Sequence, residues 1–479
     1  MKKPRLSFGQ IWNLSFGFLG VQIGYSLQNS NTSSIFESLG ADVSHLSYFW
    51  LAAPLAGMII QPIVGMFSDG TWTRFGRRIP YILGGALVST VALLLMPNCP
   101  VLLAIAPLAM GAFILLFMDL SFNVTMQPFR ALVADMLDDS QKTQGYVVQT
   151  FLINLGAVIG AFLPLMMTWF GVPDEAAPGQ VSRHIAYSYY AGGIILLLTV
   201  LVTSFKTKEY PPQEFAEYNG LDCEPGKGDG AEVHSAGEDH SAGEDHPAGE
   251  GIPQAAGPDK KPGFLSLMRN IPKVMLQLGV VQFFSWAALF LMWTYLKPAI
   301  TGVVTDPATG QVLSDGATQT WVGVLNGIYP IPACLVSIFL GRIAARYGNK
   351  TVYALCLLCG ALGFAGLMFI HNQYLMMLPM VGIGIAWAGI LAMPYSILSR
   401  GVDARSMGAY MGIFNFTITI PQIVIGLTGG LIVKQAFGSD AGLMLGLASV
   451  FMLFAAISVA FVRQTDSGQA CHVTEKKQL

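Results

Sequence analysis

The sequence predicts an all-α membrane protein with twelve transmembrane helices arranged in two groups of six. Only 11% of the 479 residues are charged and 53% are hydrophobic, whereas about 25% of residues are charged in soluble domains. Apolar segments of about 20 residues, the length needed to cross a bilayer, recur along the chain. One long hydrophilic stretch separates these segments into two sets of equal number, which indicates two halves.

The first set of apolar segments predicts six helices. Their approximate ranges are 10–32, 45–68, 79–97, 102–126, 145–170 and 185–205. Each is long enough to span the membrane, and together they form an expected N-terminal bundle over residues 1–205.

The hydrophilic stretch, residues 206–271, is expected to be a disordered cytoplasmic loop. It contains HSAGEDHSAGEDHPAGEG, an imperfect six-residue repeat around His234, His240 and His246. This repeat has almost no large apolar residue, so it cannot bury enough apolar surface to fold. Weak metal binding by the three histidines is the alternative. We expect a solvated tether, with no resident metal and no cofactor.

The second set of apolar segments predicts six further helices, in an expected C-terminal bundle over residues 272–463. Their approximate ranges are 272–298, 319–341, 350–371, 374–398, 407–433 and 440–463. Asn415, followed by Pro421, predicts a bend in the fifth of them. Residues 464–479 are expected to be a cytoplasmic tail.

The charges of the short connections predict that both termini lie in the cytoplasm. Lys and Arg are enriched in cytoplasmic loops, and alternate connections carry Arg74, Arg77, Arg78, Lys142, Arg342, Arg346, Lys350, Arg400 and Arg405. We therefore expect a multi-pass protein of the cell membrane, either an inner or a plasma membrane. Its partner is the lipid bilayer, and the net charge of −2 gives no reason to expect nucleic acid.

One helix carries a polar stripe within the expected membrane. In MDLSFNVTMQPFRALVAD (118–135), the residues Asp119, Asn123, Gln127 and Arg130 are four, four and three positions apart. At 100° per residue they fall within about 80° of one another. A charged side chain at the bilayer centre costs about 2.5–3.5 kcal/mol, so this stripe should face the protein interior.

Asp119 is the only carboxylate that we place near the middle of the membrane. Burial and a nearby cation act in opposite directions on the ionisation of such a group, so a change of geometry can switch its protonation. The alternative is a buried pair of Asp119 and Arg130 that only fixes helix packing. Their offset of roughly 16 Å along the helix argues against a permanent contact.

A second charged group lies where the second and third helices meet the cytoplasm. Asp69 precedes a turn with Arg74, Arg77 and Arg78. Asp69 can pair with an arginine or cap a helix end, and the resulting network would latch one conformation. Asp135, at the end of the fourth helix, is a further candidate for this latch. The alternative is that these charges only determine topology.

Four segments resemble a known family of transporters. GMFSDGTWTRFGRRIP (65–80) resembles the signature loop of the major facilitator superfamily. It is more closely similar to the corresponding loop of plant sucrose–proton symporters and animal proton-associated sugar transporters. GVQIGYSLQNSNTSSIFESLGA (20–41), the segment 118–135 and NLGAVIG (154–160) extend the resemblance. Among bacterial proteins, the chain is similar to maltose and sucrose permeases of the glycoside–cation symporter group.

The resemblance implies a fold, a function and two functional residues. It implies the major facilitator fold, usually a monomer, with Asp119 as the proton-coupling carboxylate and Arg130 as its charged partner. The second half matches only weakly, Ile79 replaces the usual third basic residue, and the central loop is unrelated. The charged stripe is absent from the second half, which favours ion chemistry in the first half and substrate binding mostly in the second.

A site for a neutral sugar needs amides and carboxylates for the hydroxyl groups and aromatic rings for the apolar ring face. We expect such a site among Tyr25, Gln28, Asn29, Asn123, Gln127, Gln149, Asn154, Gln282, Trp286, Asn326, Trp387 and Asn415, with Gln22, Asn31, Trp293, Tyr329, Tyr395 and Gln422 as further candidates. Amides in membrane helices often join helices instead, so only part of this set should face the cavity.

The sequence thus predicts a proton-coupled importer of a disaccharide, of the maltose or sucrose type, that works by alternating access. HExxH, GxSxG and phosphate-loop motifs are missing, so we do not expect an enzyme. The alternatives are a transporter of another neutral glycoside or pentoside, an efflux antiporter, and, with less support, a membrane sugar sensor.

Overall fold

The computed structural model describes residues 3–39, 46–103, 105–173, 180–219, 264–438 and 440–463. Within these ranges the chain is helical, and β structure is limited to isolated bridges. Ten segments of the described chain are long and apolar enough to cross a membrane. Two further long helices, α1 (Phe8–Ser38) and α2 (Leu46–Asp69), precede these ten segments. The all-helical structure with these long apolar helices agrees with the predicted fold class.

The first group of helices follows the predicted order. It consists of α1 (Phe8–Ser38), α2 (Leu46–Asp69), α3 (Ile79–Leu95) with the short α4 (Cys99–Leu102), α5 (Pro107–Met136), α6 (Asp139–Trp169) and α7 (Arg183–Lys206). The prediction placed α5 at 102–126, about one turn too early at its start and nearly three turns short at its end. Pro107 stands in the first turn, a position that proline favours. The polar residues near the other end are buried between helices, so hydropathy underestimates its length.

The second group contains two interrupted helices. It consists of α10 (Lys273–Ile300), α11 (Asp315–Ile328) with α12 (Pro330–Tyr347), α13 (Asn349–Phe369), α14 (Met377–Leu398), α15 (Met407–Phe414) with α16 (Phe416–Leu431), and α17 (Gly442–Ser458). The interruption between α15 and α16 falls at Asn415, where the sequence predicted a bend. The interruption between α11 and α12 falls at Tyr329, directly before Pro330, because proline cannot donate the next helical hydrogen bond.

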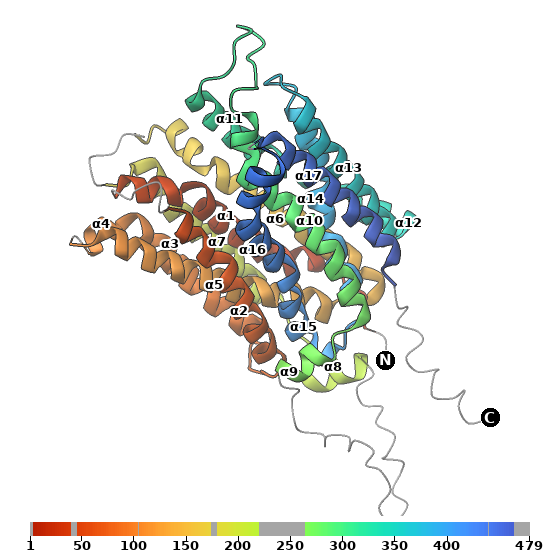
Figure 1. Ribbon diagram of the computed structural model, residues 1–479. Helices are drawn as coiled ribbons and strands as arrows, with labels where there is room; N and C mark the ends of the chain where they lie inside the picture. The colour runs from red at the N-terminus through yellow and green to blue at the C-terminus, as the bar shows by residue number, and fades with distance from the viewer. Residues whose placement is uncertain are drawn as a thin grey trace, which may run out of the picture.

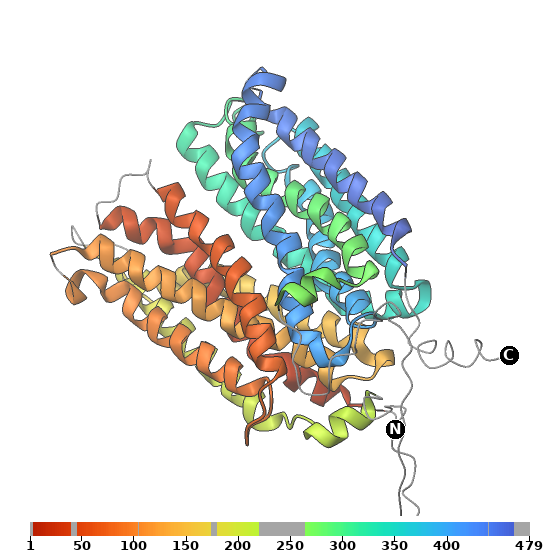
Figure 2. The ribbon, with the colours of Figure 1, turned by 60° about the horizontal axis from the view of Figure 1, so that its bottom comes forward.

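The two groups of helices lie side by side and meet at one end of the molecule (Figures 1 and 2). We call this end, at which Arg77 and Arg78 lie, the basic end. Here α2 packs against α15, and α6 packs against α12 and α14. Away from the basic end the ribbons of the two groups diverge, as Figure 2 shows most clearly.

Two short helices occupy the borders of the expected central loop. They are α8 (Pro212–Tyr218) and α9 (Phe264–Arg269), both at the basic end (Figure 1). No structure was predicted at these borders. Leu267 of α9 is buried, and Phe215 of α8 packs on Arg77. The histidine repeat, within residues 220–263, lies outside the described residues.

Candidate functional site

The carboxyl group of Asp119 is buried on α5 and is held by an amide from α1. Asp119 is 1% exposed and Gln28 is 0% exposed. The Nε2 atom of Gln28 donates a hydrogen bond of 2.5 Å to Oδ1 of Asp119. The other oxygen, Oδ2, has no hydrogen-bond partner among the described residues. Because buried polar groups are nearly always hydrogen-bonded, this oxygen marks a place where a further group is expected.

Amides extend the polar stripe from Asp119 toward the second half. Asn123 donates from Nδ2 to the backbone carbonyl of Asp119 over 2.8 Å and accepts at Oδ1 from Nε2 of Gln61 over 2.7 Å. A Cβ atom at Gly57 would lie 3.1 Å from Oδ1 of Asn123 and 3.2 Å from Nδ2 of Asn415. Because Gly57 has no side chain, Asn123 of the first half and Asn415 of the second half can both lie close to its backbone. Gln61 is not among the residues predicted from the sequence, although a lone amide in an apolar helix was a usable signal.

The cation of the stripe is not paired with Asp119. The Cζ atom of Arg130 lies 4.6 Å from the ring centroid of Tyr395 on α14. Among the described residues, Nη1 of Arg130 and the hydroxyl of Tyr395 have no hydrogen-bond partner. The two charges that the sequence analysis combined are thus held apart in this structure, one by Gln28 and the other by an aromatic ring.

Aromatic side chains of the second half gather around Trp387. The ring centroid of Trp387 is 5.5 Å from that of Trp286, 6.0 Å from that of Trp293 and 6.0 Å from that of Tyr329, all in edge-to-face geometry. Trp387 and Trp293 are half-buried. Within the described part of the chain, Nε1 of Trp286 and Oδ1 of Asn326 lack a hydrogen-bond partner. Aromatic faces and open polar atoms are therefore available on this side.

The first half contributes one aromatic ring of its own to the predicted set. Tyr25 on α1 is half-buried and packs edge-to-face against Phe122, with ring centroids 5.8 Å apart. Asn29, one turn further along α1, is exposed. Both residues lie on the helix that carries Gln28, so α1 presents several polar groups beside Asp119.

Four of the predicted amides connect helices or turns in this structure. Gln127 donates to the backbone carbonyl of Gly408 on α15. The remaining three have backbone or side-chain partners within their own halves: Gln149 donates to Phe129 O over 3.3 Å, Asn154 donates to Thr150 O over 2.9 Å, and Gln282 accepts from the hydroxyl of Tyr353 over 2.8 Å. The contacts of Gln127, Gln149 and Gln282 match the alternative role of amides as links between helices, whereas Asn154 binds the preceding turn of its own helix.

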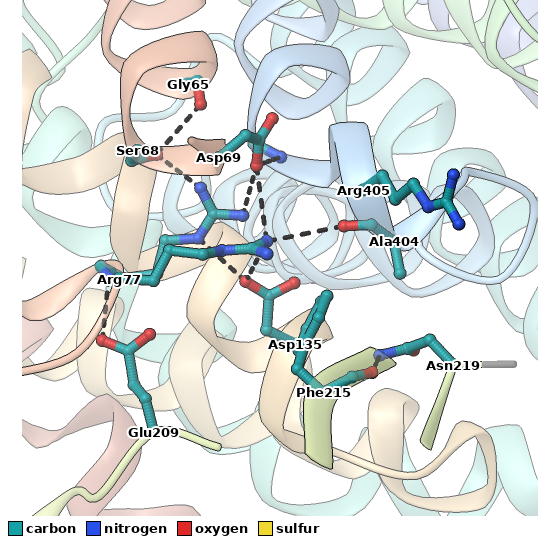
Figure 3. Close-up of polar contacts among 12 residues, drawn as sticks. Gly65, Ser68, Asp69, Arg77, Asp135, Glu209, Phe215, Asn219, Ala404 and Arg405 are labelled. Atoms are coloured by element: carbon teal, nitrogen blue, oxygen red, sulfur yellow. Dashed lines mark hydrogen bonds and ion pairs between the residues drawn. The ribbon is translucent and has the colours of Figure 1, made fainter. Parts of the chain in front are cut away.

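At the basic end, two arginines bind two carboxylates. Arg78, which is 0% exposed, donates from Nη2 to Asp69 over 2.6 Å and from Nε to Asp135 over 2.8 Å. Arg77 adds a contact of 3.0 Å to Asp135. Figure 3 shows Asp69 and Asp135 on opposite sides of Arg77. Burial alone would lower the pKa of Arg78. The negative charges of Asp135 and Asp69 outweigh the effect of burial, so the pKa of Arg78 is raised.

The same cluster joins the two halves of the molecule. Asp69 accepts hydrogen bonds from the backbone N–H groups of Gly408 over 2.9 Å and of Ala409 over 2.7 Å. Both groups lie in the first turn of α15, where N–H groups have no partner within the helix and a negative charge is favoured. We call Asp69, Arg77, Arg78 and Asp135 the charged latch. The predicted member Arg74 stays outside it: this exposed side chain stacks on Phe75, with Cζ 4.7 Å from the ring centroid.

Glu209 and Phe215, which the sequence analysis missed, cover the charged latch. Oε1 of Glu209 accepts from the backbone N–H groups of Arg78 over 2.8 Å and Ile79 over 2.9 Å, at the start of α3. Burial raises the pKa of Glu209. The ring of Phe215 on α8 lies 4.4 Å from Cζ of Arg77, and both residues line a cavity of about 270 Å³. An acidic residue directly after the sixth helix was the available signal.

A second cluster, built around the neutral side chains of Thr143, Asn349 and Ser396, also joins the halves at the basic end. The hydroxyl groups of Thr143 on α6 and Ser396 on α14 are 2.8 Å apart. Asn349 donates to Ser396 over 2.9 Å, and Arg400 donates to Thr143 over 2.8 Å. Nearby, Lys142 donates to the backbone carbonyl of Ser399 over 2.8 Å. This cluster was not predictable from the sequence, because single hydroxyl groups are common in membrane helices.

Comparisons with protein-family models match both halves of the chain. Residues 35–222 match the model described as MFS/sugar transport protein. Residues 278–476 match the model described as Major Facilitator Superfamily. The two matches leave out most of the central hydrophilic stretch.

Curated relatives are transport proteins. The sucrose transport protein SUC4 of Arabidopsis thaliana is 23% identical over 90% of this chain and 86% of its own length. The general alpha-glucoside permease of Schizosaccharomyces pombe is 30% identical over 42% of this chain and 38% of its own length. The sequence resemblance to sugar transporters is therefore confirmed across nearly the whole chain.

Solved structures share the fold. The transporter FucP in the outward conformation is similar with a TM-score of 0.65 at 13% identity, over 96% of this chain and 99% of its own. The proton:xylose symporter XylE is similar with a TM-score of 0.65 at 12% identity, over 95% of this chain and 96% of its own. These structures show the shared fold, and the family models matched over residues 35–222 and 278–476 show that the chain belongs to the major facilitator superfamily.

Proposed function

We propose that this protein is a proton-coupled importer of a disaccharide, of the maltose or sucrose type, that works by alternating access. The observation that carries the proposal is the buried carboxyl group of Asp119, whose Oδ2 is free of hydrogen bonds to the described residues. The names of the relatives, a sucrose transport protein and an alpha-glucoside permease, support this substrate class.

The sugar site that we propose lies between the amides of the first half and the aromatic rings of the second. Gln28, Asn29 and Asn123 would bind hydroxyl groups, while Trp286 and Trp387 would pack against the apolar faces of the sugar rings. A disaccharide has many hydroxyl groups and no charge, which suits a site with many amides and one titratable group.

Asp119 would carry the proton. In its protonated form the carboxyl group has one O–H donor, and Oδ2 is the atom that lacks a partner. A sugar hydroxyl could accept this hydrogen bond, so that sugar and proton bind together. Loss of the proton would then leave a buried anion, and Arg130, on the same face of α5, would be the cation to stabilise it.

The charged latch would close the cytoplasmic side in the state described. We propose that the basic end faces the cytoplasm, with both termini on that side of the inner or plasma membrane, because basic connections favour it. The division into bundles at 1–205 and 272–463, a loop at 206–271 and a tail at 464–479 is proposed with it, as is a monomeric state.

The experiment that tests the function uses purified protein in liposomes that contain a pH-sensitive dye. Addition of maltose or sucrose to one side should acidify the other side, at a rate that depends on the sugar. Sugar entry without proton movement would contradict proton coupling. Proton exit upon sugar entry would favour an antiporter, and binding of sugar without any flux would favour a sensor.

A further inference from the structure

A groove on the outside of the second half lies between α10 and α16. These two helices pack against each other, and α9 lies beside α15 at the basic end (Figure 1). The groove has a volume of about 420 Å³ and is lined by α9, α10, α15 and α16. Small-molecule sites have volumes of about 300–1,000 Å³, so this groove is large enough to take part of a ligand.

The lining of the groove is apolar. Among the described residues that line it, Thr417 alone has a polar side chain, and its hydroxyl donates to the backbone carbonyl of Phe414 over 2.7 Å. The lining residues Leu276, Val280 and Ile420 are exposed. The groove therefore offers an occupant apolar contacts rather than hydrogen bonds, as an acyl chain requires.

The groove is about as long as one leaflet of a bilayer is thick. Along α10 its lining residues run from Met275 to Phe284, which is roughly 14 Å at 1.5 Å per residue. The hydrocarbon core of a bilayer is about 30 Å thick, so one leaflet takes about 15 Å. The groove begins at the basic end, where Met268 and Ile271 line it. One acyl chain of the leaflet on that side therefore fits along its length.

The short helix α9 is held in place at the basic end of the groove. The ring of Phe264 meets that of Phe416 edge-on, with centroids 6.5 Å apart. The hydroxyl of Tyr410 on α15 donates over 3.1 Å to the backbone carbonyl of Asn270, directly after α9. These contacts keep the backbone of Arg269, the last residue of α9, beside the groove.

Two basic side chains stand at this end of the groove. Arg269 ends α9, and Lys273 begins α10. Lys273, Leu276 and Val280 are three and four residues apart, so Lys273 lies on the face of α10 that lines the groove. Both basic side chains are exposed and make no ion pair with the described residues. Their charges are therefore available to an anionic group at the membrane surface.

We propose that this groove binds one anionic phospholipid of the leaflet at the basic end, with an acyl chain along α10 and α16 and the headgroup phosphate at Arg269 and Lys273. Ile413 and Phe416 line the groove on either side of Asn415, so the bound chain contacts both parts of the interrupted helix. Lipid binding at this site is independent of the proposed transport function and can be measured without sugar.

The test measures phospholipid bound to the purified full-length protein in detergent by native mass spectrometry. The two probes are dioleoyl phosphatidylglycerol, which is anionic, and dioleoyl phosphatidylcholine, which has the same chains and no net charge. Each basic residue near a membrane surface strengthens the binding of anionic lipid about fivefold, so the unchanged protein should bind phosphatidylglycerol about 25-fold more tightly. A photoreactive group in the acyl chain should label α10 and α16.

Arg269→Gln combined with Lys273→Gln should lower the affinity for phosphatidylglycerol about 25-fold, to that for phosphatidylcholine. The matched control is Arg342→Gln combined with Arg346→Gln. It removes two exposed cations of the basic end from α12, a helix that does not line the groove. Because charges distant from the headgroup are screened by salt, the affinity of this control should stay within about twofold of the unchanged protein.

Gly279→Leu should weaken the binding of both lipids about tenfold, the equivalent of about two CH₂ groups of buried chain. Gly279 lines the groove, and a Cβ atom there would lie 3.4 Å from Cγ2 of Thr417, an ordinary contact. Val280→Trp fills the groove from its exposed side and serves if the leucine variant does not fold. The matched control is Gly430→Leu on α16, where nothing lies within 4 Å of an added Cβ; it should leave binding unchanged.

Equal affinities of the unchanged protein for the two lipids, or equal effects of the two glutamine pairs, would overturn the headgroup site. Equal effects of Gly279→Leu and Gly430→Leu, or labels confined to other helices, would overturn the chain site. If lipid binds only after residues 223–257 are deleted, the protein's own chain occupies the groove, which also contradicts the proposal. Failure of sugar to move protons in the liposome assay would overturn the proposed function alone.

Discussion

Gln28 donates a hydrogen bond of 2.5 Å from its side-chain amide to the buried carboxyl group of Asp119. The two residues belong to α1 and α5, and the bond fixes one carboxyl oxygen while the other remains without a partner. An amide can donate from its nitrogen and accept at its oxygen, so Gln28 suits both protonation states of Asp119. This pair is where the proposed proton chemistry can be tested most directly.

Asp119→Asn should abolish uphill sugar accumulation. The amide copies the protonated carboxyl group in size and still accepts from Gln28, but it cannot release a proton. Sugar exchange down a gradient should therefore remain. The measurement compares accumulation and exchange in the same liposomes, with Glu214→Gln on the exposed face of α8 as the control. If the Asp119→Asn protein still takes up protons with sugar, the coupling carboxylate lies elsewhere, and Asp135 is the next candidate.

Gln28→Leu should weaken transport without changing the fold. It removes the amide that binds Asp119 and keeps a side chain of similar size. A hydrogen bond to a charged group contributes about 1.5–3 kcal/mol, so we expect a loss of about 10- to 100-fold in the apparent sugar affinity or the transport rate. Initial rates at several sugar concentrations measure both. The control is Gln149→Leu, which removes a link between helices outside this pair; an equal loss there would mean that the effect of Gln28→Leu is general.

Replacing Arg77 and Arg78 together with Gln should slow transport while sugar affinity stays within a few fold. The charged latch lies far from Asp119, because Asp119 and Asp135 are separated by roughly 24 Å of helix. Removal of the cations leaves the buried Asp135 and the half-buried Asp69 without a countercharge. Loss of one partner of a buried ion pair costs about 3–5 kcal/mol. Arg74→Gln is the control, since that side chain is exposed and outside the latch. Complete loss of sugar binding at normal protein level would contradict this prediction.

Gly412→Ala should open the basic end and slow the transport cycle. A Cβ atom at Gly412 would lie 2.6 Å from Cα of Pro62 on α2 and would also meet the carbonyl oxygen of Gln61. These are backbone atoms, so α2 and α15 must move apart. Gly430→Ala is the matched control, because nothing lies within 4 Å of its added Cβ and alanine there favours the helix by about 1 kcal/mol. Sugar uptake and thermal stability are the measurements, and equal behaviour of the two variants would refute the close contact.

Glu209→Gln should make stability less dependent on pH. Burial raises the pKa of Glu209 in the folded protein. The folded state therefore binds this proton more tightly than the unfolded state, and the resulting stability is lost as pH rises through the folded pKa. Glutamine still accepts from the N–H groups of Arg78 and Ile79 but has no charge to bury. The measurement is the unfolding temperature between about pH 4 and pH 8. An unchanged pH profile in Glu209→Gln would show that this carboxyl group is effectively solvated.

Much of the fold was predictable from local properties of the sequence. Runs of apolar residues fix where helices lie, because a backbone within lipid must satisfy its own hydrogen bonds. The spacing of Asp119, Asn123, Gln127 and Arg130 places them on one face of α5 for the same geometric reason, and all four are buried or half-buried there. All four members of the charged latch were likewise candidates from the sequence, together with Arg74, which lies outside the latch in this structure.

The contacts between distant segments could not be predicted in this way. The central loop was expected to be unstructured from residue 206, yet Glu209 and Phe215 fold onto the charged latch. Hydropathy is averaged over a window of many residues. A few apolar side chains and one carboxylate within a hydrophilic window change that average too little to predict a folded segment. The partners of Gln149 and Gln282 were equally hidden, because an amide in a membrane helix looks the same whether it binds a ligand or another helix.

The sequence by itself determined the class of the fold, the order of the helices and the polar face of α5, since these depend on residues close together in the chain. Only the tertiary structure decided that Asp119 meets Gln28, that Arg130 meets Tyr395, and that Asp69 meets the N–H group of Ala409, 340 residues away. Which face of one helix meets which face of another depends on how all the helices pack together, and no local pattern of residues records that arrangement.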